Sequence, residues 1–123
     1  MASQFDGPGQ IKLATLDDAQ IKAQHLHAIV ERFASAVKLQ SETGSFRMQI
    51  QRAATPLVGL LKPQFGQISD IVVGLMLISA RGGSLQMKVR ALRESVAQLR
   101  MQLEIAVTKT KEKHALPEQD VAN

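Results

Sequence analysis

The chain has 123 residues, which is enough for one domain built around one hydrophobic core. Its apolar share of 45% is close to that of globular proteins, so wholesale disorder is excluded. The absence of Cys excludes a disulfide framework, a thiolate nucleophile and a zinc–thiolate site. It also fits a reducing compartment, and we therefore expect a cytoplasmic protein.

The first ten residues lack the basic and apolar regions of a secretory signal. The longest apolar stretch, Ile68 to Ala80, has only 13 residues and contains Asp70. A membrane-spanning helix needs about 20 apolar residues. We therefore predict no membrane span.

The N-terminal residues 1–14 contain Gly7-Pro8-Gly9 and few apolar side chains, which predicts a flexible arm. Thr15 then offers a helix N-cap, followed by acidic residues that the helix dipole favours in a first turn. Apolar residues recur at spacings of four, three and four, at Leu26, Val30, Phe33 and Val37. This pattern predicts an amphipathic helix from Leu16 to Glu42.

Gly44 is the expected C′ glycine of that helix, and Ser45 is the expected N-cap of the next. The second apolar stripe comprises Phe46, Ile50, Ala53, Leu57 and Leu60. Pro56 falls inside this stripe, so it must kink the helix or restart it with Thr55 as a new N-cap.

Pro63 is the expected start of a third helix, which ends at Gly82-Gly83. Its segment 71–78, IVVGLMLI, is apolar all round. Such a run also fits a buried strand, but no other segment offers a strand to pair with it. We therefore predict a central, buried helix.

Ser84 is the expected N-cap of the last helix, which carries the clearest pattern in the chain. A heptad stripe runs along it through Leu85, Val89, Leu92, Val96, Leu99, Leu103 and Ala106. The helix should continue to His114 or Leu116, because Pro117 disfavours further helix, and residues 117–123 form a tail. The sequence thus predicts one all-α domain over residues 15–116, a small bundle of about four helices with a long amphipathic C-terminal helix.

Residues with catalytic or metal-binding chemistry are scattered. His25 and His27 lie about 200° apart on a helix, so they cannot share one metal ion. The carboxylates form no Glu-x-x-His pair, and the glycines form no phosphate-binding loop. We predict no catalytic, cofactor-binding or metal-binding residues, and hence a protein that is not an enzyme.

The last helix has a second apolar face at Met101 and Ile105, which one neighbouring helix cannot cover. Residues 81–113 also hold eight basic and three acidic residues, while the whole chain carries a net charge of +4. Arg93 and Arg100 share one face of this basic segment. We expect Met101, Ile105, Arg93 and Arg100 to form a protein interface, in a homodimer or higher homo-oligomer or with an acidic protein.

A parallel zipper is disfavoured, because Lys88 of one copy would face Arg93 of the other. The pattern predicts a non-enzymatic interaction module, such as an adaptor, scaffold or assembly factor, that self-associates. One alternative is a basic nucleic-acid-binding protein of the nucleoid-associated type, using the same basic residues. Another is an amphipathic coat that opens onto a membrane or a hydrophobic particle.

Overall fold

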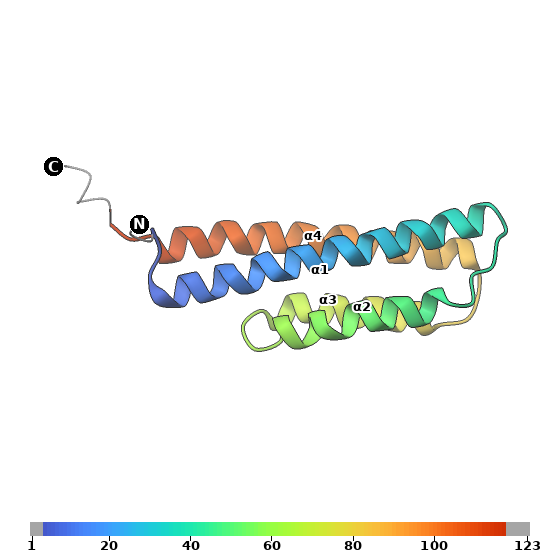
Figure 1. Ribbon diagram of the computed structural model, residues 1–123, viewed down its shortest axis with the longest axis horizontal. Helices are drawn as coiled ribbons and strands as arrows, with labels where there is room; N and C mark the ends of the chain where they lie inside the picture. The colour runs from blue at the N-terminus through green and yellow to red at the C-terminus, as the bar shows by residue number, and fades with distance from the viewer. Residues whose placement is uncertain (1–3, 118–123) are drawn as a thin grey trace.

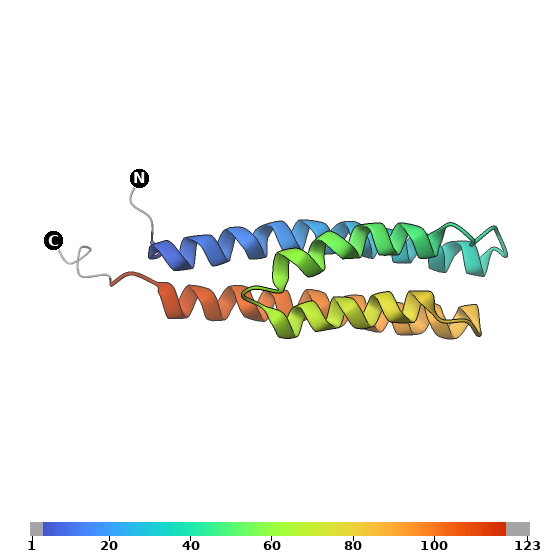
Figure 2. The same ribbon diagram turned by 90° about the horizontal axis from the view of Figure 1, so that it is seen from below.

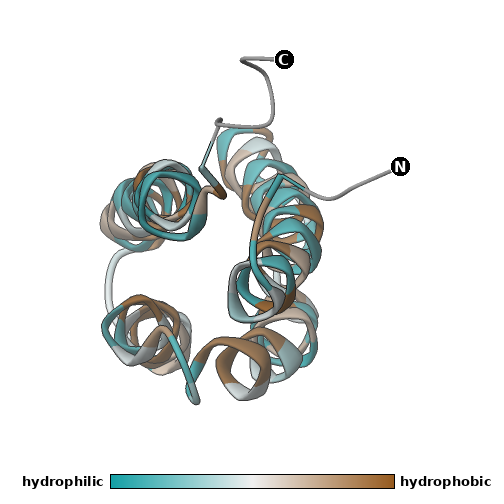
Figure 3. Ribbon diagram, turned by 90° about the vertical axis from the view of Figure 1, so that its left-hand side faces the viewer, coloured by the Kyte–Doolittle hydropathy of each residue, from teal (hydrophilic) through white to brown (hydrophobic). Residues whose placement is uncertain are grey.

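The computed structural model describes residues 4–117 and shows an all-α four-helix bundle, as predicted (Figure 1). The helices are α1 (Gly7–Lys38), α2 (Phe46–Leu61), α3 (Gly66–Ala80) and α4 (Leu85–His114). Viewed from one end, they lie at the corners of a square (Figure 3). Within the described part of the chain, backbones approach closely only between α1 and α2, α2 and α3, α3 and α4, and α1 and α4.

The two outer helices in the sequence are about twice as long as the two inner ones. Helices α1 and α4 have 32 and 30 residues, whereas α2 and α3 have 16 and 15. The α2–α3 hairpin therefore lies along only part of the α1–α4 pair (Figures 1 and 2). Beyond it, the start of α1 and the end of α4 project together as a two-helix segment.

The core on α1 and α4 follows most of the predicted apolar stripes. On α2 the predicted Phe46, Ala53 and Leu60 are only half-buried, and Ala54 and Leu61 are buried in addition to Ile50 and Leu57. On α4 the buried residues are Val89, Leu92, Val96, Leu99 and Leu103, while Leu85 in the first turn is exposed. On α1 the buried stripe includes Leu16, Leu26, Val30 and Phe33. These two stripes face each other because α1 and α4 run antiparallel along nearly their whole length.

Helix α1 begins earlier than predicted. Its N-cap is Asp6, whose Oδ1 accepts a hydrogen bond from the Gly9 amide at 2.7 Å. Pro8 fits the first turn, where its missing N–H has no helical partner to lose. Residues 7–14 of the predicted arm therefore belong to α1, and Thr15 lies inside the helix rather than at its cap. The predicted tail, residues 117–123, lies outside the described residues except for Pro117.

The end of α1 also differs from the prediction. The helix stops at Lys38, and Gln40 rather than Gly44 adopts the left-handed conformation, with φ of 56°. The Ser41 amide donates to the Ala36 carbonyl at 2.8 Å, which is the long hydrogen bond of a Schellman-type end. The expected C′ glycine is not used, because Gln40 adopts the left-handed conformation that glycine usually takes at a helix end.

Pro56 does not restart α2, which runs as one helix from Phe46 to Leu61. Thr55 does not act as a new cap, because its hydroxyl donates to the Gln51 carbonyl at 2.7 Å. The side chain of Gln51 in turn donates to the Ser79 hydroxyl at 2.8 Å and ties α2 to α3. Packing against two neighbouring helices holds the chain helical through the proline.

Helix α3 is not central. It occupies a corner of the bundle and packs against α2 and α4 only. Its apolar segment therefore buries Val72 and Leu75 but leaves Val73 and Leu77 exposed, at 40% and 58%. Hydropathy alone could not reveal this, because an all-round apolar helix is compatible with both burial and an uncovered outer face.

The buried stripe of α4 yields a stability prediction. Leu92, Leu99 and Leu103 have no exposed surface. We expect Leu→Ala at each of them to lower the free energy of unfolding by about 2–5 kcal/mol, measured by urea denaturation. Losses below about 0.5 kcal/mol at all three sites, far under that range, would contradict the packing described here.

Candidate interaction surfaces

The predicted interface residues Met101 and Ile105 lie on the outer side of α4. Their side chains are 52% and 38% exposed, and they point away from the buried stripe of the same helix. The core is therefore complete without them. Their role as an interface remains a prediction.

The two predicted interface arginines have different surroundings. Arg93 donates two hydrogen bonds to the Glu31 carboxylate on α1, from Nη2 at 2.8 Å and from Nε at 2.9 Å. These hydrogen bonds lower the pKa of Glu31, and they occupy Arg93 within its own chain. Arg100 is exposed and forms no ion pair with any residue from 4 to 117.

A second cluster joins the two ends of the chain. The Nδ1 of His114, at the end of α4, lies 3.0 Å from Oδ1 of Asp6, and its Nε2 lies 3.3 Å from the Lys12 amine. A carboxylate can only accept and an ammonium can only donate. Both contacts are thus satisfied when Nδ1 of the imidazole donates to the carboxylate and Nε2 accepts from the amine. The arrangement is a carboxylate–imidazole–amine chain that sequence reasoning did not find.

This cluster serves as a clasp between α1 and α4. Asp6 also caps α1, and its backbone amide donates to the His114 carbonyl at 3.2 Å. Gly9 lies directly against the side chain of His114, so that an added methyl group would overlap the Cβ of that histidine. Each component is therefore engaged in holding the projecting two-helix segment together.

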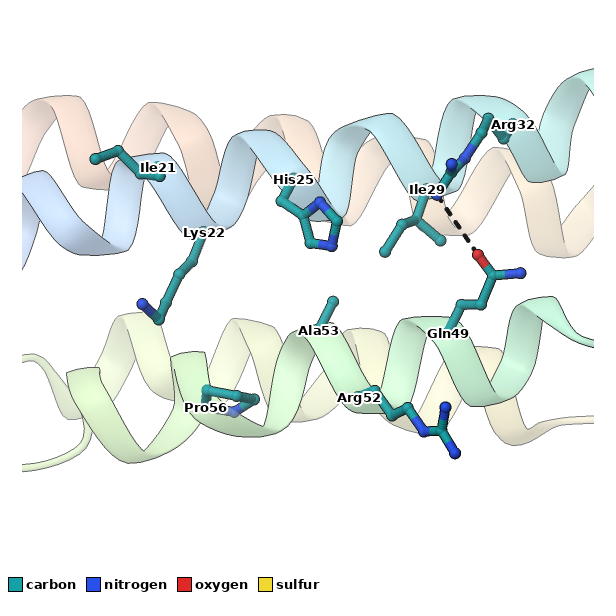
Figure 4. A pocket seen from close by; sticks show the side chains of 9 residues that line it. All are labelled: Ile21, Lys22, His25, Ile29, Arg32, Gln49, Arg52, Ala53 and Pro56. Carbon is teal, nitrogen blue, oxygen red and sulfur yellow. Dashed lines mark hydrogen bonds between the residues drawn. The ribbon is translucent and has the colours of Figure 1, made fainter.

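The third feature is a groove of about 480 Å³ between α1 and α2 (Figure 4). Apolar side chains from both helices form its floor, namely Ile21, Ile29, Ala53 and Pro56. Ile29 is buried, whereas Ile21 is 64% exposed although it belongs to a well-packed helix. In the close-up, His25 and Lys22 extend from α1 toward α2, and Ala53 points into the groove from the opposite side.

The rim of this groove is basic. Lys22, His25, Arg32 and Arg52 line it, and no carboxylate does. Lys22 pairs with Asp18 at 2.8 Å beyond the lining, and Arg32 contacts only the Gln49 amide oxygen, at 3.5 Å. Arg52 forms no ion pair with the residues described here. Among the Lys and Arg side chains of the rim, only the guanidinium groups of Arg32 and Arg52 meet no carboxylate within residues 4–117. Apolar side chains beside these two unpaired cations are suited to an acidic amphipathic ligand.

Comparisons of the chain with protein-family models, with curated proteins and with solved structures each found no match. Within residues 4–117, no three His, Asp or Glu side chains gather as a metal site would require. None of the four helices is long and apolar enough to cross a membrane.

Sequence reasoning missed the clasp and the groove for different reasons. Asp6 and His114 lie at opposite ends of the chain, and nothing local signals their meeting. The groove does have a partial signal, because Ile21, His25 and Arg32 follow each other at helical spacing on a face of α1 outside the core stripe. Which helix lies opposite that face is decided only by the tertiary fold.

The close contact at Gly9 yields a pair of predictions with opposite signs. We expect Gly9→Ala to lower the free energy of unfolding by about 1–3 kcal/mol, because the new Cβ overlaps His114. Gly59→Ala in α2 is the matched control, since its Cβ would meet open space. It should raise stability by about 0.5–1 kcal/mol through helix propensity. Equal effects of the two variants in thermal or urea denaturation would contradict the clasp.

The clasp should also respond to acid. The hydrogen bond from the Gly9 amide, together with His114 and Lys12, lowers the pKa of Asp6. A carboxyl group with a lowered pKa in the folded state stabilises that state above its ordinary pKa of about 4. This contribution is lost as the pH falls below that value, through the lowered pKa.

We therefore expect hydrogen exchange of the Gly9 amide to accelerate relative to mid-helix amides as the pH falls below about 4. Asp6→Asn keeps a capping oxygen without a titrating charge, and it should abolish this dependence. An unchanged dependence in the Asn variant would show that another group is responsible.

Proposed function

We propose that this chain is a non-enzymatic protein–protein interaction module, of the adaptor, scaffold or assembly-factor kind. In this proposal the α1–α2 groove binds an acidic amphipathic helix of a partner protein, and the chain also associates with copies of itself. The observation that carries the proposal is the combination of an apolar floor and a basic, carboxylate-free rim in one groove.

The shape of the groove favours a helical ligand. Two neighbouring helices present ridges of side chains, and a third helix packs into the space between them. From Ile21 to Arg32 the α1 side of the groove spans about 16 Å, which is three helical turns. On the α2 side, Ala53 is small and allows a bound helix to approach closely.

The chemistry of the groove favours protein over nucleic acid. Phosphate contacts need only cations, whereas the exposed side chain of Ile21 offers aliphatic surface that a phosphate backbone does not use. Single-stranded nucleic acid is additionally bound by base stacking on large aromatic side chains, and no Phe, Tyr or Trp lines the groove. An acidic helix with apolar residues at i, i+4 and i+7 uses both the floor and the rim.

A direct test uses a labelled model peptide, helical, with Leu at i, i+4 and i+7 and Glu at the flanking positions. We expect fluorescence anisotropy to show saturable binding that weakens with salt. The double variant Arg32→Glu/Arg52→Glu should lower the affinity by about tenfold or more, because like charges then face each other. Arg90→Glu/Lys109→Glu, two charge reversals at exposed positions of α4, is the control with the same change in net charge and should have little effect.

The same experiment separates the alternatives. Equal binding of a peptide with Lys in place of Glu would contradict an electrostatically selective groove. An equal loss with Arg90→Glu/Lys109→Glu would show only a response to net charge. Salt-dependent binding of a labelled DNA duplex in place of the peptide would favour the nucleic-acid-binding function.

A further inference from the structure

We propose that two copies of this chain pair antiparallel through the outward face of α3. This inference rests on the proposed self-association and assigns it to a surface other than the one predicted on α4. It starts from the exposed side chains of Val73 and Leu77 on a helix whose inward side is already buried. Between them lies Gly74, where an added Cβ would meet only open space.

The outermost row of α3 consists of Asp70, Gly74, Leu77 and Arg81, at spacings of four, three and four. Such spacing places these residues on one side of a helix. Arg81 is the C-cap, directly after the last helical residue. Along the row, an acidic residue is followed by a glycine without a side chain, then by an apolar residue and finally by a basic residue.

The row can pair with a second copy of itself that runs in the opposite direction. About a twofold axis midway between Gly74 and Leu77, the acidic residue of one copy meets the basic residue of the other, and the leucine meets the glycine. Leu77 of one copy lies over Gly74 of the other, where no side chain blocks it. Asp70 of one copy lies opposite Arg81 of the other. The twofold axis repeats both contacts, as an isologous interface requires.

Charge also determines the direction of pairing. Asp70 and Arg81 are both exposed, and neither forms an ion pair within residues 4–117. Antiparallel pairing gives each of them an opposite charge. Parallel pairing would place Asp70 against Asp70 and Arg81 against Arg81, which costs affinity through like-charge repulsion.

The adjoining surface adds apolar area on one flank. A groove of about 390 Å³ runs between α2 and α3, and Val58, Val73, Met76 and Leu77 contribute to its wall. A contact centred on one short helix still remains at the lower end of the area range of specific interfaces. The dimer is therefore a weak one, with a dissociation constant in the micromolar range.

The test uses two single variants, Asp70→Arg and Arg81→Asp, in sedimentation velocity from about 10 to 300 μM. Each variant alone places two like-charged pairs in the interface, and should dimerise at least about tenfold more weakly than wild type. When the two variants are mixed, every pair is of opposite charge. The mixture should therefore form a heterodimer, and high salt should weaken it.

Leu77→Glu should abolish dimerisation, and circular dichroism verifies that all variants remain helical. If the wild type dimerises but the charge variants dimerise equally well, the α3 interface is wrong while self-association stands. Dissociation by Met101→Glu/Ile105→Glu would then place the interface on α4. A wild type that stays monomeric at 300 μM would refute the proposed self-association as well as the α3 pairing.

Discussion

The antiparallel packing of α1 against α4 determines the rest of the architecture. Two helices of about thirty residues bury a continuous stripe of Leu and Val against each other, and the clasp of Asp6 and His114 closes their far end. The α2–α3 hairpin is only half as long and can add a second layer along part of this pair. The α1–α2 groove and the exposed face of α3 both involve this shorter layer.

In the α2–α3 layer, each helix has one side that packs into the bundle and another side that faces away from it. For α2 the exposed side chains are mixed: Met48 is exposed as well as Arg47 and Arg52, and Arg52 lines the groove shared with α1. For α3 the outward side is apolar at Val73 and Leu77, since that helix has almost no charged residue except Asp70. The core of the bundle is thus fully buried, whereas apolar side chains such as Ile21, Val73 and Leu77 remain exposed on its surface. Both proposed interactions start from these exposed side chains.

The sequence was sufficient to predict the all-α fold class, because the spacing of apolar residues and the capping residues of helices are local properties of the chain. The Ser84 cap of α4, its end near His114 and its buried stripe from Val89 to Leu103 follow from spacing and residue type, and the structure confirms them. Leu85, predicted in the same stripe, is exposed. Gly7-Pro8-Gly9 was misjudged because glycine and proline indicate a loop unless a distant contact requires them. Here the required contact is between Gly9 and His114, at the opposite end of the chain.

The candidate surfaces were less predictable, since each depends on which helices become neighbours. The exposure of Met101 and Ile105 followed from their position off the stripe, whereas the engagement of Arg93 by Glu31 did not. For α3, the sequence shows an excess of apolar residues but not how many neighbours will cover them. A helix with three neighbours would have been central, and α3 has two.

Methyl NMR spectroscopy tests the central claim, that the uncovered apolar side chains of this bundle are binding surfaces. Spectra of Ile, Leu and Val methyl groups would be recorded on dilution, and again with an acidic amphipathic peptide. We expect dilution to shift the signals of Val73 and Leu77, and the peptide to shift those of Ile21. If the signals of these three residues remain unchanged in both series, the exposed side chains are a passive surface and the proposed interactions are contradicted.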